Sequence, residues 1–133
     1  MTRKNFSIAA LAVLLFAALA APSALADCRH KASLGITAAG AAIDSSGTAE
    51  VRAQGTRQRL KVSIDARVPD GTTFLVFANG MPAGSLTIEL GAGELDINNA
   101  NGKVLPAGVS PVCGIKSVQV LDGTGVAILE GSF

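Results

Sequence analysis

The chain contains no tryptophan and no tyrosine, and its one histidine is His30. Without Trp or Tyr, it offers no obvious aromatic platform on which a sugar ring could stack. A Ser-His-Asp site would have to combine His30 with a distant serine. No serine lies in a Gly-x-Ser-x-Gly turn, and Ser110 is followed by Pro111. We therefore expect no catalytic residue of this class, and we expect His30 to be an exposed side chain.

Paired carboxylates could still support glycoside hydrolysis if they faced each other across a cleft. Glu94 and Asp96 are two residues apart, so they share one face of a strand, and Glu89 on a neighbouring strand could join them. The same three side chains could equally be solvated. The solvated interpretation is favoured, because nothing else in the sequence marks a substrate cleft.

Metal-binding patterns are also weak. The segment 96–102 is rich in oxygen ligands, as calcium prefers, but Ala100 occupies a place where a ligand is wanted. A strand end followed by an Asn-Gly turn explains the same residues without a metal. A site built from Asp27, Cys28 and His30 would require a free thiol. We expect no metal and no cofactor.

The first 26 residues have the three parts of a secretory signal peptide. Arg3 and Lys4 are basic, an apolar run follows from residue 8 to 21, and Ala24-Leu25-Ala26 is a small-x-small cleavage site. The apolar run is short for a transmembrane anchor. A lipidated Cys28 would need a small residue before it, where Asp27 stands. We predict cleavage after Ala26.

Residues 27–133 are expected to form a single exported domain, periplasmic or secreted. Loss of Arg3 and Lys4 leaves nine basic and ten acidic side chains, so no overall charge attracts nucleic acid. Both cysteines remain, and two cysteines in an exported chain predict one disulfide, Cys28 to Cys113. Two free thiols, or an intermolecular bond, are the alternatives.

Strand patterns dominate this region. Over residues 57–68, apolar side chains at even positions alternate with charged ones at odd positions, and residues 48–54 alternate likewise. Gln54-Gly55-Thr56 joins the two runs into a predicted hairpin. Further strands are predicted near residues 32–37, 72–78, 85–90, 94–98, 115–121 and 126–133.

The helix signal is poor, and the small, polar region 35–47 is expected to be loosely held. Leu90 and Phe133 are both predicted to be buried. Asp122-Gly123 between the last two strands is a strong hairpin signal. Seven to eight short strands with regular turns predict an all-β fold, a small antiparallel β-sandwich of the immunoglobulin-like or Greek-key type.

Basic side chains on the predicted hairpin, residues 50–67, are the most suggestive candidates for binding. Alternation places at least three of them on one face, where a row of cations could meet an anionic polymer or surface. Charged rows also protect exposed strands from edge pairing, and a solvated face of this kind is the favoured interpretation. The candidate residues are Arg52, Arg57, Arg59, Lys61 and Arg67.

These observations favour a non-catalytic exported or cell-envelope module with a structural or binding role. Its partner could be a protein or an anionic polymer at the cell surface, and no specific nucleic-acid recognition or transmembrane segment is expected after cleavage. The first alternative is a binder of an anionic polymer through the basic hairpin. The second is a small secreted enzyme or enzyme inhibitor that acts through the loop 99–111.

Overall fold

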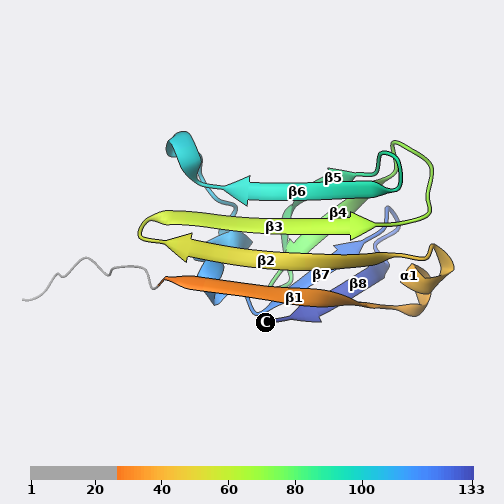
Figure 1. Cartoon of the computed structure of the whole chain (residues 1–133), viewed down its shortest axis with the longest axis horizontal. Helices are drawn as coiled ribbons and strands as arrows, with labels where there is room; N and C mark the ends of the chain where they lie inside the picture. Colours follow the sequence, from red (N-terminus) through yellow and green to blue (C-terminus); the bar gives the residue numbers. More distant parts are fainter. Residues whose placement is uncertain (1–26) are drawn as a thin grey trace, which may run out of the picture.

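A computed structural model describes residues 27–133; the predicted signal peptide, residues 1–26, lies outside the described residues. Short strands account for most of the described chain (Figure 1). The strands are β1 (Cys28–Ile36), β2 (Ser46–Gln54), β3 (Arg57–Asp65), β4 (Thr73–Ala78), β5 (Met81–Thr87), β6 (Ala92–Asn98), β7 (Ser117–Leu121) and β8 (Ala127–Ser132). One helical turn, α1 (Ala38–Ala42), and three 3-10 turns, η1 (Ala100–Gly102), η2 (Ala107–Val109) and η3 (Val112–Gly114), complete the set.

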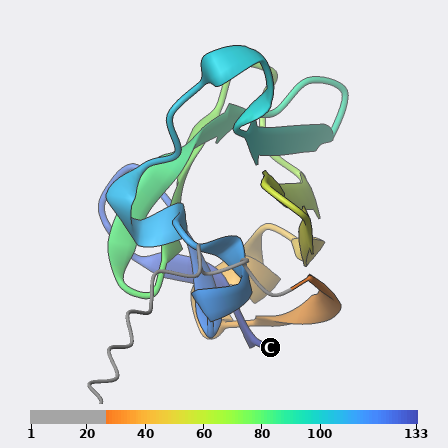
Figure 2. The ribbon, with the colours of Figure 1, turned by 90° about the vertical axis from the view of Figure 1, so that its left-hand side faces the viewer.

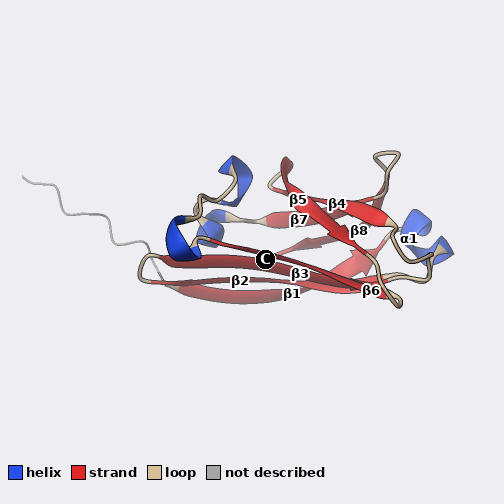
Figure 3. Ribbon diagram, turned by 90° about the horizontal axis from the view of Figure 1, so that it is seen from above, coloured by secondary structure: helices blue, strands red, loops and turns tan. Residues whose placement is uncertain are grey.

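The eight strands form one antiparallel sheet in the order β5-β4-β7-β8-β1-β2-β3-β6. The sheet folds over into a front layer, β1, β2, β3 and β6, and a back layer, β4, β5, β7 and β8 (Figure 3). β1 joins the layers, because Gly35 and Ile36 also pair with β8. β5 and β6 pack together without a shared ladder, so the sheet is nearly closed (Figure 2). The all-β prediction is confirmed.

Alternation explains why the front layer forms as it does. β2 and β3 pair residue for residue, from Ser46 opposite Asp65 to Gln54 opposite Arg57, and the predicted hairpin is confirmed. Gly55 has φ +61° in the connecting turn, a conformation that glycine adopts without steric cost. The register sends one set of side chains inward and the charged set outward.

Both layers contribute to one apolar core. Val51 and Leu60 from the front layer are fully buried, as are Val76 and Val120 from the back layer. Phe74 has only 2% of its surface exposed. Because β2 and β3 place every second side chain in this core, their outward side chains are free to carry another function.

Two of the apolar predictions are wrong. Leu90 is 92% exposed, because it lies at the β5–β6 turn with φ +54°, and its N–H is bonded to the Asp70 carboxylate. Phe133 was expected to be buried but is 36% exposed, and its ring lies 6.4 Å from that of His30. A turn residue and a chain end have few neighbours to pack against, whatever their side chains are.

The region expected to be loosely held, residues 35–47, is instead anchored. The Thr37 hydroxyl accepts a hydrogen bond from the Gly40 N–H and caps α1, which is seated against β8. Gly40 is buried, and the hydroxyl of Ser45 donates to its carbonyl. A Cβ at residue 40 would lie 2.1 Å from the carbonyl oxygen of Ile128, so only glycine allows this approach.

The predicted disulfide is present and ties the start of the described chain to the segment that precedes β7. Cys28 at the start of β1 is bonded to Cys113 in η3, with their Cα atoms 5.9 Å apart. The buried Gln58 side chain accepts a hydrogen bond from the N–H of Val112. The segment carrying η2 and η3 therefore packs against the end of the sheet nearest the β2–β3 turn (Figure 2).

Candidate anion-binding face

Three arginines stand side by side on the outer face of the front layer. Arg29 of β1 is directly opposite Arg52 of β2, and Arg52 is directly opposite Arg59 of β3. We call these three residues the arginine row. It runs across the strands, near the β2–β3 turn, and all three residues are exposed. Adjacent strands are about 4.8 Å apart, so the row spans roughly 10 Å.

The next file of outward residues, one pleat further from the turn, alternates in sign. Lys31 is opposite Glu50, Glu50 is opposite Lys61, and Lys61 is opposite Asp96. Opposite charges across strands stabilise a sheet modestly, whereas like charges directly opposite destabilise it. The alternating file therefore follows the ordinary pattern, and the arginine row does not.

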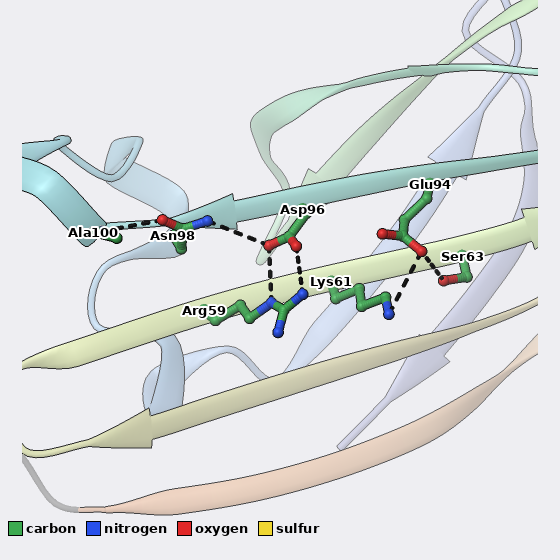
Figure 4. Close-up of polar contacts among 7 residues, drawn as sticks. All are labelled: Arg59, Lys61, Ser63, Glu94, Asp96, Asn98 and Ala100. Carbon is green, nitrogen blue, oxygen red and sulfur yellow. Dashed lines mark hydrogen bonds and ion pairs between the residues drawn. The ribbon is translucent and has the colours of Figure 1, made fainter.

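Arg59 is the one member of the row with an ion-pair partner among the described residues. Its guanidinium donates two hydrogen bonds to Asp96 of β6, one of them from Nε to Oδ1 at 2.9 Å (Figure 4). These hydrogen bonds raise the pKa of Arg59 and lower the pKa of Asp96. Asp96 thus occupies Arg59 with a carboxylate in the bidentate geometry that an external anion would use.

Lys61 is held more weakly. Its ammonium lies 3.5 Å from the Glu94 carboxylate, which the Ser63 hydroxyl also approaches at 3.5 Å (Figure 4). Both charged side chains are well exposed, and exposed pairs contribute at most about 1 kcal/mol. An incoming anion could displace Glu94 at little cost.

Arg29, Arg52 and Arg57 make no ion pair within the described part of the chain. A shallow hollow of about 290 Å³ lies at this end of the face, lined by residues 27–29 and 52–54. Arg29 and Arg52 both contribute to its wall. The Asp27 carboxylate on the same wall accepts a hydrogen bond from the Gly55 N–H. Arg29 and Arg52 thus border a hollow that is open to solvent.

The structure brings together four of the five basic residues predicted from the hairpin. Arg52, Arg57, Arg59 and Lys61 share the outer face of the front layer. Arg67 does not, because β3 ends at Asp65; its side chain instead lies 3.3 Å from Asp44, and both are largely exposed.

Sequence reasoning missed two residues of this face, Arg29 and Lys31. Their alternation with less polar neighbours over residues 29–34 is visible in the sequence. What the sequence did not reveal is that this segment begins β1 and pairs with β2 over its whole length, which places Arg29 beside Arg52.

The other candidate residues make ion pairs or lie in turns of the fold. Glu94 and Asp96 share a face as predicted but are paired with Lys61 and Arg59, and Glu89 lies in the β5–β6 turn. No cluster of three or more His, Cys, Asp or Glu side chains that could hold a metal occurs among residues 27–133.

Oxygen atoms in the segment 96–102 are likewise engaged within the fold. The side-chain oxygen of Asn98 accepts from the N–H of Ala100, and that of Asn99 accepts from the N–H of Gln58. These bonds hold η1 and the end of β6 against β3. The Asn-Gly turn therefore accounts for the composition of this segment.

Protection of sheet edges does not explain Arg52 and Arg59 of the arginine row. Edge strands often carry Lys or Arg to prevent pairing with other chains. β2 and β3, however, each have a partner strand on both sides, so Arg52 and Arg59 guard no edge. Like charges directly opposite each other cost some stability, and only Arg59 offsets this cost with an ion pair, to Asp96.

Within residues 27–133, no helix has the length and apolar character required to cross a membrane. Comparisons of the chain with protein-family models, with curated proteins and with solved structures found no match in any of the three.

Proposed function

We propose that this chain is a non-catalytic exported module that binds an anionic polymer or surface through the outer face of its front layer. The single observation that supports this most is the arginine row, three cations in direct cross-strand register, where like charges are ordinarily unfavourable. Guanidinium groups suit the task, because each presents a fork of N–H donors that matches carboxylate, sulfate and phosphate oxygens.

Charge is distributed unevenly, which supports the same function. Of the nine basic residues in the described chain, six lie on this one face: Arg29, Lys31, Arg52, Arg57, Arg59 and Lys61. The domain as a whole is close to neutral, so an anion is attracted to one face and not to the whole molecule.

The disulfide supports an exported location, in the periplasm or outside the cell. Disulfides persist in oxidising compartments and are rare in the cytosol. Cleavage of residues 1–26 is part of this proposal. It can be checked by mass spectrometry of the exported product, which should begin at Asp27.

A binding assay with two double variants tests the function. We expect the purified domain, residues 27–133, to bind a polyanion such as heparin, with an affinity that falls steeply as salt rises. Arg29→Ala with Arg52→Ala should weaken binding at least tenfold, because each lost charged hydrogen bond contributes about 1.5–3 kcal/mol.

Lys103→Ala with Lys116→Ala is the matched control, since it removes two exposed cations that lie off this face. It should leave the affinity nearly unchanged. Equal weakening by the two double variants, or an affinity that does not respond to salt, would contradict the proposed function.

A further inference from the structure

We propose that the ligand of this face is a linear acidic polysaccharide, carboxylated or sulfated, which lies across β1, β2 and β3 along the arginine row. This inference rests on the proposed function and names its ligand. It follows from the width of the positively charged track, the direction of that track and the side chains around it.

The track is one residue wide. On the side away from the β2–β3 turn, the adjacent file alternates Lys31 and Lys61 with Glu50 and Asp96, and the file beyond it includes Glu94. A flat anionic surface such as a membrane would meet these carboxylates together with the arginines. A thin polymer that follows the row meets the arginines and avoids Glu50 and Glu94.

The direction of the row suits a chain with closely repeated charges. Arg29, Arg52 and Arg59 lie on consecutive strands, so neighbouring members of the row are about 4.8 Å apart along the sheet. A polysaccharide with an acidic group on its sugar rings presents anions at short, regular intervals along an extended chain. Each guanidinium can then engage a different unit through two parallel hydrogen bonds.

The absence of aromatic side chains on this face argues against nucleic acid as the ligand. Proteins that bind single strands stack the bases on aromatic rings. The strands of the front layer contain no Phe, Tyr or Trp. The same absence argues against neutral sugars, which rely on stacking, so the acidic groups must supply most of the affinity.

The hollow beside the row provides room for a sugar unit. Arg29 and Arg52 line it together with Asp27, whose carboxylate is hydrogen-bonded to the Gly55 N–H. Gln54 adds an amide that can both donate to and accept from a sugar hydroxyl. Arg57 is directly opposite Gln54 across the hairpin. One acidic unit seated here would place its neighbours in line with Arg59.

Displacement of Asp96 is part of binding. Arg59 already binds the Asp96 carboxylate, and that ion pair is partly exposed. A ligand carboxylate or sulfate that takes the place of Asp96 would form an ion pair of similar strength. Asp96 would therefore lower the affinity without preventing binding.

The decisive experiment relocates one arginine without changing the composition. In the swap variant, Arg52→Thr is combined with Thr48→Arg, which moves the cation along the outer face of β2 to a position opposite Ser33 and Ser63. Net charge and strand are preserved while the row is broken. The proposal predicts at least a tenfold loss of affinity for polygalacturonate and for heparin, measured by isothermal titration calorimetry.

Circular dichroism and urea unfolding establish that the swap variant is folded, and Arg52→Gln serves as a second break in the row if it is not. Retention of wild-type affinity by either folded variant would overturn the proposal, since attraction by net charge alone would then suffice.

Four ligands of matched total charge separate the possible sources of the anion. The wild-type domain should bind polygalacturonate or heparin more tightly than a single-stranded DNA oligonucleotide or vesicles containing phosphatidylglycerol. Tighter binding of the DNA or the vesicles would overturn the polysaccharide inference and leave the proposed function standing. If the domain bound none of the four ligands, both the polysaccharide inference and the proposed function would be overturned.

Discussion

The two layers of the molecule share one core but differ sharply on their outer faces. The four front strands carry ten charged residues, whereas the four back strands carry one, Glu130. Leu75 and Leu121 are paired on the outside of the back layer, where the front layer has arginines. Folding alone cannot require this charge, because the back layer forms the same kind of sheet without it.

Inward and outward side chains of the front strands therefore have different roles, the first in packing and the second in binding. The inward set is fixed by packing, and its substitution should affect stability. The outward set should affect binding and leave stability nearly unchanged.

Val62→Asp should have the largest effect, because Val62 is fully buried and would leave an unpaired charge in the core. We expect the free energy of unfolding to fall by at least ~3 kcal/mol, as measured by urea denaturation. Lys61→Asp, one residue away on the outer face, should cost less than about 1 kcal/mol. Similar tolerance of both substitutions would show that the register of β3 is wrong.

Gly40→Ala should be the next most damaging. The added methyl group would meet the backbone carbonyl of Ile128, so α1 or β8 must shift. Overpacking of this kind costs about 1–3 kcal/mol. Thermal unfolding is the measurement, and Gly123→Ala is the control, because nothing lies within 4 Å of a Cβ at that exposed turn position. Equal melting temperatures for the two variants would contradict the close packing of α1.

Asp96→Asn should strengthen binding to a sulfated polymer two- to fivefold, because it releases Arg59 from a surface ion pair worth up to about 1 kcal/mol. Glu89→Gln makes the same change of charge in the β5–β6 turn and should have little effect. Titration calorimetry at fixed salt compares the two. A gain of equal size in both variants would mean that overall charge, and not the arginine row, governs affinity.

Leu75→Lys should have the smallest effect. Leu75 is 42% exposed on the back layer, so its replacement should change the free energy of unfolding by less than about 1 kcal/mol. It adds a cation on the face without the row, and the affinity for polyanions should stay the same. An increase in affinity comparable to that of Asp96→Asn would remove the distinction between the two faces.

The local features of the fold could be predicted from the sequence. The β2–β3 hairpin follows from alternation and from Gly55, and the β7–β8 hairpin from Asp122-Gly123. In both cases the paired residues are close in sequence, so one segment contains all the information needed.

Pairings between distant segments could not be predicted. β6 returns from the β4–β5 hairpin to pair with β3, and this brings Asp96 to Arg59. Nothing in the local pattern of residues 92–98 identifies β3 as the partner. The candidate site could therefore be predicted only in part. Its cations on the hairpin follow from the sequence, whereas the positions of Arg29 and of the competing carboxylate, Asp96, depend on the strand order.

The position of β1 has a consequence for the order of folding. β1 is the first strand of the described chain, yet its last two residues pair with β8, the last described strand. Such long-range pairing slows folding, because the chain loses entropy before the contact forms. The two layers cannot be joined through β1 until β8 is in place, so Gly35 and Ile36 keep an unpaired edge until then.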